Sequence, residues 1–214
     1  MRLTLTSLVA AVLVSGAVSR PADAAVIPLS NAAITVGEIC ANFDCVTFAG
    51  LLEAPFSFPS TIGDDGGLTS VVLAGNVPAT TGLFLYGYSI ASFATSPEGI
   101  LGLTVPFEAL APPGFSFVSG AVGTVPTVAA SYDDILALAS FFFDPVTTLL
   151  PGETSNLFGA LSTLPPVLLN ATVQGRDTGV SANALVPASV PEPVTLLLLG
   201  AGGLAVAARK RYAG

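Results

Sequence analysis

The stretch FLYGYSI, residues 84–90, alternates large apolar or aromatic side chains with smaller ones. In a β-strand, side chains at every second position point to the same face. Phe84, Tyr86, Tyr88 and Ile90 would therefore share one face. This period-two pattern predicts a β-strand.

Similar runs of β-favouring residues alternate with turn sequences along the chain on both sides of this stretch. The predicted strands are 46–53, 68–74, 83–93, 101–107, 115–119, 135–143, 156–162 and 167–175. Between them lie glycine- and proline-rich turns such as 63–67 and 96–99, where glycine permits a positive φ and proline fixes φ near −65°. Short strands at this spacing are typical of a sandwich. We therefore predict a mainly β protein with a single β-sandwich-like domain over 25–175, followed by a linker over 176–189.

Residues 131–143 have two interpretations. Ser131 with Asp134 three residues later can cap a helix, and the run after them lacks polar alternation. A buried strand also fits this apolar run, and a strand is our expectation there.

The composition excludes one class of partner. Arg176 is the one basic residue between 25 and 190, against twelve carboxylates, so this part of the chain has a net charge near −11. Binding to nucleic acid depends on lysine and arginine, so we expect no nucleic-acid partner.

The chain contains no histidine, so it has no imidazole for a Ser-His-Asp or Cys-His hydrolase and no usual zinc site. A carboxylate-only glycosidase is the remaining enzyme alternative. Its sugar platforms are usually aromatic, and the chain has four tyrosines and no tryptophan. We expect a protein that is not an enzyme and that carries no cofactor.

Two pairs of aspartates are the densest acidic positions, Asp64 with Asp65 and Asp133 with Asp134. Calcium takes six to eight oxygen ligands, so these pairs are its candidate ligands if they come together in the fold. Neither matches an EF-hand. We expect solvated turn carboxylates, with calcium binding as the alternative.

Cys40 and Cys45 are the two cysteines of the chain. An isolated pair in an exported protein is typical of a disulfide that closes a small loop. The alternative is a redox or metal pair, but there is no Cys-x-x-Cys spacing. We predict a structural disulfide.

The first residues have the features of a signal peptide. Arg2 precedes an apolar run over 3–17, and small residues then occupy the positions that signal peptidase recognises. We predict a signal peptide over 1–24 with cleavage between Ala24 and Ala25. An N-terminal membrane anchor is the alternative.

A second apolar run covers 194–208 and is followed by Arg209, Lys210 and Arg211. As a helix it spans roughly 22 Å, short of the ~30 Å hydrocarbon core, but snorkelling flanks and a thinned bilayer allow it to cross. The three basic residues fit a cytoplasmic end. We predict a transmembrane helix that contacts the membrane, rather than a buried core helix.

Val190, Pro191, Glu192 and Pro193 precede that helix as a stiff, extended and accessible peptide. Together with the helix and the basic end, 190–214 resembles the PEP-CTERM sorting signal. The resemblance implies a Gram-negative host that makes exopolysaccharide. It also implies processing by an exosortase, a membrane-embedded cysteine protease or transpeptidase.

The expected function follows from this resemblance. We expect signal peptidase and exosortase to process a precursor tethered to the inner membrane. The product would be a structural or adhesive protein of the cell surface or extracellular matrix, in or near the exopolysaccharide. The alternatives are a permanently anchored protein and a carbohydrate-binding or carbohydrate-cleaving module that uses carboxylates with or without calcium.

Overall fold

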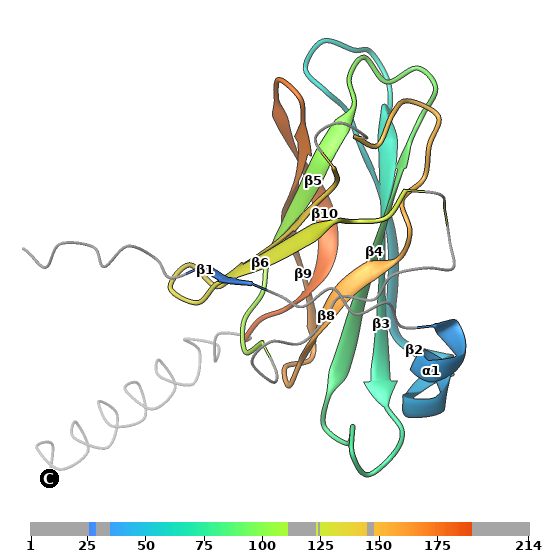
Figure 1. Ribbon diagram of the computed structural model, residues 1–214, viewed down its shortest axis with the longest axis vertical. Helices are drawn as coiled ribbons and strands as arrows, with labels where there is room; N and C mark the ends of the chain where they lie inside the picture. Colours follow the sequence, from blue (N-terminus) through green and yellow to red (C-terminus); the bar gives the residue numbers. More distant parts are fainter. Residues whose placement is uncertain (1–25, 29–34, 111–122, 124, 145–147, 190–214) are drawn as a thin grey trace, which may run out of the picture.

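Two antiparallel sheets lie face to face in the computed structural model, with a short helix beside one end (Figure 1). The structure describes residues 26–28, 35–110, 123, 125–144 and 148–189. The predicted mainly β fold is confirmed.

The smaller sheet has four strands in the order β2-β3-β4-β8. Their bounds are Phe43–Phe56 for β2, Gly66–Gly75 for β3, Phe84–Ser92 for β4 and Phe158–Ser162 for β8. Strands β2 to β4 are consecutive neighbours, whereas β8 joins from much later in the sequence.

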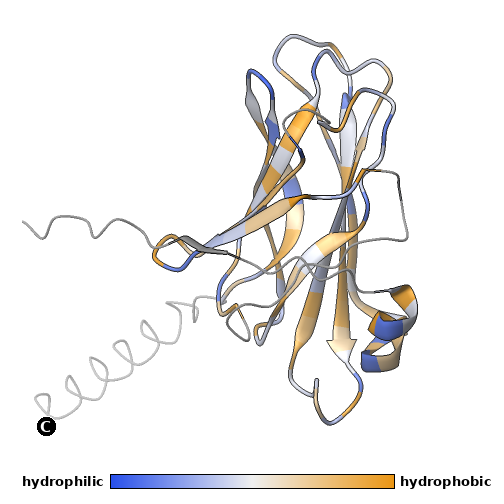
Figure 2. Ribbon diagram, viewed as in Figure 1, coloured by the Kyte–Doolittle hydropathy of each residue, from blue (hydrophilic) through white to orange (hydrophobic). Residues whose placement is uncertain are grey.

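The larger sheet has six strands in the order β1-β6-β7-β5-β9-β10. Their bounds are Val26–Pro28 for β1, Ala129–Asp133 for β6, Leu138–Phe142 for β7, Ile100–Pro106 for β5, Pro166–Gly175 for β9 and Gly179–Pro187 for β10. Figure 2 shows hydrophobic residues interleaved with hydrophilic ones along these strands.

The core lies between the two sheets, and β4 is its main contributor from the smaller sheet. Tyr86, Tyr88 and Ile90 are fully buried in it, and Phe84 packs against its margin, as the alternation predicted. From the larger sheet, the ring of Phe141 lies 6.1 Å from that of Tyr88. One hydrophobic cluster therefore joins the inner faces of both sheets.

Two buried hydroxyl groups make long-range hydrogen bonds from β4. The Tyr88 hydroxyl donates to the carbonyl of Leu185 in β10 at 3.0 Å, and the Tyr86 hydroxyl donates to the carbonyl of Leu164 at 2.7 Å. Each tyrosine keeps its polar end paired inside an apolar environment, as burial of a hydroxyl requires.

The helix α1, Val36–Asn42, covers one end of the outer face of the smaller sheet. Its Ile39 packs with Phe43, Leu73, Leu85 and Leu161 in a second hydrophobic cluster. Both faces of β4 are therefore buried near the helix. The other end of this outer face carries no such cover from α1.

Six predicted strands match observed ones in place and differ by a few residues at their ends: 46–53, 68–74, 83–93, 101–107, 156–162 and 167–175. The predicted strand 115–119 lies outside the described residues.

The interpretation of 131–143 needs a correction. It forms neither one strand nor a capped helix but the end of β6, a turn, and β7. The Asp133 carboxylate accepts hydrogen bonds from the backbone N–H groups of Ile135 and Leu136, and Ala137 adopts a φ of 51°. This local bonding favours a turn over helix or continuous strand.

The prediction of a linker over 176–189 is wrong, because most of that range is β10. This strand pairs with β9 along its whole length, from Gly179 opposite Gln174 to Pro187 opposite Pro166. Its residues Ala182 and Ala184 are buried in the main core. The small side chains along β10 alternate between core and solvent.

Candidate functional site

The uncovered end of the outer face of the smaller sheet contains a hollow of about 410 Å³. We call it the outer-face hollow and define it by Glu53, Pro55, Gly67, Thr69 and Phe93. Across the strands, Glu53 lies opposite Thr69 and Pro55 lies opposite Gly67. These residues therefore share the solvent face of β2 and β3.

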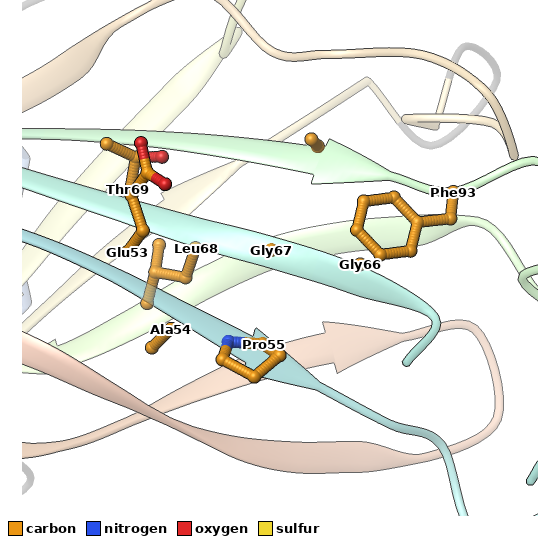
Figure 3. Close-up of a pocket in the computed structure, with 9 residues that line it drawn as sticks. Glu53, Ala54, Pro55, Gly66, Gly67, Leu68, Thr69 and Phe93 are labelled. Atoms are coloured by element: carbon orange, nitrogen blue, oxygen red, sulfur yellow. The ribbon is translucent and has the colours of Figure 1, made fainter. Parts of the chain in front are cut away.

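Figure 3 shows the two ends of the outer-face hollow. The Phe93 ring lies at one end, Glu53 and Thr69 lie at the other, and the backbone at Gly66 and Gly67 runs between them. A Cβ added at Gly67 would meet nothing within 4 Å, so the glycine leaves real open space above the sheet.

Asp65 fixes the backbone position of Phe93. Its carboxylate is 2% exposed and accepts hydrogen bonds from the Phe58 N–H at 2.6 Å and from the Thr61 hydroxyl. Its carbonyl accepts a hydrogen bond from the Phe93 N–H at 2.8 Å. Asp65, a candidate calcium ligand in the sequence, therefore stabilises the β2–β3 loop by internal hydrogen bonds. Its carbonyl also fixes the backbone position of Phe93.

The structure does not bring the two aspartate pairs together. Asp64 and Asp65 precede β3 at one end of the sheets, whereas Asp133 and Asp134 begin the β6–β7 turn at their side (Figure 1). Asp133 is engaged in its own turn. Across the described ranges, no three histidine, cysteine or acidic side chains gather where they could hold a metal ion.

A second feature fixes the point at which the chain leaves the larger sheet. After β10, the backbone N–H and the hydroxyl of Ser189 both donate to one carboxylate oxygen of Glu108, each at 2.7 Å. The Glu108 N–H in turn donates to the Pro187 carbonyl at 2.9 Å. We call this the Glu108–Ser189 contact.

Several interactions hold Glu108 in place for that contact. It follows Phe107, which is fully buried with its ring 5.5 Å from that of Tyr86. The Ser162 hydroxyl hydrogen-bonds to the Glu108 carbonyl at 2.9 Å. The hydrogen bond from the Ser189 N–H, and then that from its hydroxyl, lower the pKa of Glu108.

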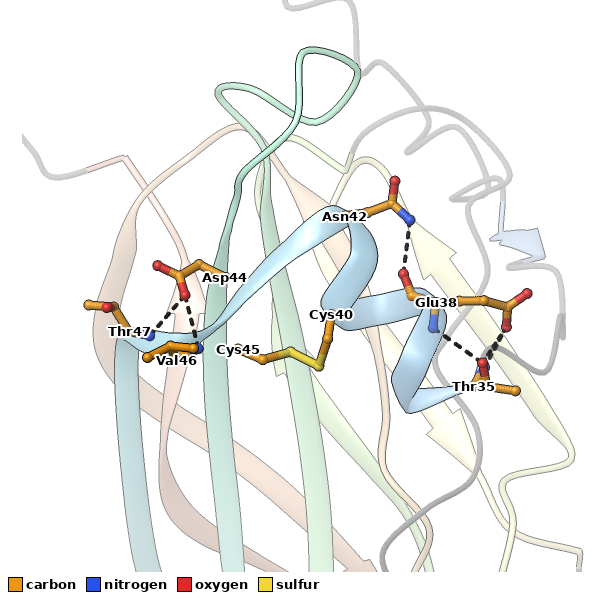
Figure 4. Close-up of a disulfide and its surroundings, with 8 residues drawn as sticks. All are labelled: Thr35, Glu38, Cys40, Asn42, Asp44, Cys45, Val46 and Thr47. Carbon is orange, nitrogen blue, oxygen red and sulfur yellow. Dashed lines mark hydrogen bonds between the residues drawn. A yellow bond between two sulfur atoms is a disulfide. The ribbon is translucent and has the colours of Figure 1, made fainter.

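The predicted disulfide is confirmed. Cys40 and Cys45 are bonded with a Cα–Cα distance of 5.3 Å, and they join the last turn of α1 to the start of β2 (Figure 4). The helix begins with a capping box, in which Thr35 and Glu38 exchange hydrogen bonds of 3.2 and 2.8 Å. This segment is a structural support.

Two carboxylates in the same segment have lowered pKa values. Hydrogen bonds from the Thr35 N–H and then its hydroxyl lower the pKa of Glu38. The N–H groups of Thr47 and Val46 lower that of Asp44. Glu38 is exposed and Asp44 is half-buried, and each carboxylate accepts hydrogen bonds from residues two or three positions away.

The remaining predicted site residues lie outside the described residues. They are the cleavage residues Ala24 and Ala25, the motif Val190, Pro191, Glu192 and Pro193, and the basic residues Arg209, Lys210 and Arg211. The predicted helix over 194–208 lies there too. Within the described ranges, no helix is long and apolar enough to cross a membrane.

Sequence reasoning missed the outer-face hollow and the Glu108–Ser189 contact. The sequence predicts a turn over 63–67, but Gly66 and Gly67 lie in β3. Two adjacent glycines inside a strand indicate a place where no side chain covers the backbone and another group can approach it closely. No local pattern indicates that Glu108 meets Ser189.

Comparison with known proteins agrees with the tail's sequence. The family model of the PEP-CTERM protein-sorting motif matches residues 189–211. No curated protein and no solved structure matches the chain. The chain therefore carries this sorting motif, and the motif supports export and targeting to the cell surface.

Proposed function

We propose that this PEP-CTERM-sorted protein serves at the cell surface or in the extracellular matrix as a structural or adhesive component without enzymatic activity. The observation that carries the proposal is the sorting motif itself, whose match begins at Ser189. That residue follows the last strand of the larger sheet by two positions. The sorting signal therefore follows the folded part with almost no spacer.

The route to the surface is part of the proposal. Signal peptidase would cut between Ala24 and Ala25, and the helix over 194–208 would hold the precursor in the inner membrane. Exosortase would then recognise the motif around Pro191 and Pro193 and remove the tail. The Glu108–Ser189 contact supports this division of the chain, because it holds the residue at which the motif begins.

A role in binding or structure is supported over catalysis by the makeup of the outer-face hollow. A glycosidase needs two carboxyl groups about 5–9.5 Å apart on either side of the scissile bond. The described lining of the hollow contains one, Glu53. A single carboxylate at one end of the hollow and an aromatic ring at the other suit the carbohydrate-binding alternative rather than the cleaving one.

The test is the intact mass, with mapping of the terminal peptides, of the protein recovered from its native host. The proposal predicts a mature chain that begins at Ala25 and ends within or next to 191–193. If peptides through Arg211 persist in the mature pool, the tail is a permanent anchor and the processed form does not exist.

A further inference from the structure

We infer that the outer-face hollow binds a short oligosaccharide of pyranose units that carry no acidic groups. The inference rests on the proposed adhesive function and names its ligand class. It is carried by four properties of the hollow: open space, an aromatic end, an unpaired polar end, and the absence of cations from its lining.

The open space is built into the strand sequence. Gly67 lies opposite Pro55 on one side and Ala91 on the other, so no long side chain rises from this part of the sheet. The φ of Gly67 lies outside the left-handed region, and an added Cβ would touch nothing. The backbone therefore does not require glycine here, and the space above it is available to a ligand.

The aromatic end is suited to the C–H face of a sugar. The Phe93 side chain is 43% exposed, although its backbone is fixed by the hydrogen bond to Asp65. An aromatic face carries partial negative charge, and the axial C–H groups of a pyranose carry partial positive charge. Pro55 adds an apolar ring to the lining, next to the backbone at Gly66 and Gly67.

The polar end offers hydrogen-bonding groups that the protein itself leaves unused. Neither the Glu53 carboxylate nor the Thr69 hydroxyl hydrogen-bonds to another group within the described residues. The carboxylate accepts from two neighbouring hydroxyls, and the threonine donates or accepts. A pyranose presents such hydroxyls around its edge while its faces are apolar, which matches both ends of the hollow.

Charge then selects among sugars. The lining of the hollow holds one carboxylate and no basic side chain, and Arg176 belongs to the β9–β10 turn of the other sheet. A uronic acid or a phosphate would be repelled. A peptide lying on this face would leave most of its backbone N–H and C=O groups unpaired, since two side chains cannot satisfy them. Neutral sugars and amino sugars remain.

The test is a calorimetric titration of the full chain, in a detergent without a sugar headgroup, against three probes. These are hexasaccharides of glucose, of glucosamine and of galacturonic acid. The variants are Gly67→Val, which fills the hollow, Glu53→Gln and Phe93→Ala. The matched control is Thr172→Val, an exposed threonine on the outer face of the other sheet.

We expect saturable binding of the glucose or glucosamine probe and none of the galacturonate probe. Gly67→Val should abolish binding, Glu53→Gln should weaken it about tenfold through loss of a charge-assisted hydrogen bond, and Thr172→Val should leave it unchanged. Circular dichroism shows that each variant is folded. The inference is overturned if neither uncharged nor amino sugar binds at about 10 mM, if galacturonate binds equally, or if Gly67→Val binds as before.

These results are separate from those on the proposed function. Loss of sugar binding with correct processing and surface location in the host would refute the inference and leave the sorting proposal standing. Sugar binding by a protein whose tail persists in the host would support the inference and refute the sorting proposal.

Discussion

Replacement of Tyr88 by phenylalanine tests the polar connection between the two sheets. The ring is fully buried, and its hydroxyl donates to the Leu185 carbonyl at 3.0 Å across the core. Phenylalanine keeps the ring and removes that bond. Because a hydrogen bond contributes about 1 kcal/mol net, the variant should be less stable by about that amount at pH 8.

The effect should change sign in alkali. Burial, and then the neighbouring Tyr86, raise the pKa of Tyr88 well above its ordinary value of 10.0. Below pH 10 the hydroxyl is protonated in both states, and its contribution is complete. Above pH 10 the unfolded tyrosine ionises while the folded one does not, so the wild-type free energy of unfolding falls by about 1.4 kcal/mol per pH unit for this group.

Phenylalanine does not ionise, so the variant loses no stability at position 88 as the pH rises. Tyr88→Phe should therefore equal the wild type between about pH 10 and 11 and exceed it at higher pH. The assay is urea unfolding, followed by far-ultraviolet circular dichroism at pH 8, 10 and 11. Thiol exchange does not complicate alkaline samples, since both cysteines of the chain are paired.

The outcome that refutes this reasoning is a stability difference that stays constant from pH 8 to 11, which would mean that Tyr88 ionises as readily folded as unfolded. Tyr86→Phe is the companion variant. Burial raises the pKa of Tyr86 as well, and its hydroxyl donates to the Leu164 carbonyl at 2.7 Å. It should show the same change of sign.

Three further predictions concern the chain exit, the disulfide and the smaller sheet. Glu108→Ala should lower the protection of the Ser189 amide against hydrogen exchange at pH 7 with little change in melting temperature. In the wild type the protection factor, taken relative to the intrinsic rate at each pH, should fall as the pH drops below 4.5, because the contact lowers the pKa of Glu108 and is lost when the carboxylate is protonated. Unchanged protection in Glu108→Ala would exclude a holding role. Replacing both Cys40 and Cys45 by alanine should destabilise by at most about 2 kcal/mol, or about 4–8 °C by calorimetry, because the sequence separation of 5 closes a small loop; a larger loss would mean that the bond supports more than this loop. Gly159→Ala should lower the free energy of unfolding in urea by about 3 kcal/mol, the upper end of the usual cost of overpacking, since its methyl group would overlap a backbone carbonyl of β4. Wild-type stability would show that the strands can separate there.

The strands were predictable where side chains of contrasting size alternate. In β4, Tyr86, Tyr88 and Ile90 differ strongly from the residues between them, and all three lie in the core. The pattern is set locally by the two-residue period of the strand, so it needs no knowledge of the partner strands.

The same period exists in β10 but was not recognised. Val180, Ala182, Ala184 and Val186 are buried, while Ser181 between them is exposed. Alanine buries little apolar area, so the contrast with serine is weak in sequence. Tertiary pairing with β9 decides the structure of such a segment. The capping box at Thr35 and Glu38 was readable by contrast, and α1 was missed because the segment is short.

The outer-face hollow depends on pairing that no local pattern contains. Glu53, Gly67 and Ala91 come from three strands and become neighbours through the register of β2, β3 and β4. The Glu108–Ser189 contact joins residues 81 positions apart. Sequence reasoning found the residues of the sorting motif because they are contiguous, and it missed these sites because they are not.

The order of the strands also bears on how the exported chain folds. As the chain emerges with its amino-terminal end first, β4 and β5 appear long before β8 and β9, the later strands with which they pair. Until the segment Phe158–Ser162 and the strands after it arrive, both strands present unpaired backbone to other chains. Contacts so distant in sequence form slowly. A chaperone that holds the unfolded chain, or a low local concentration during export, would therefore decide how much of the newly made protein escapes aggregation.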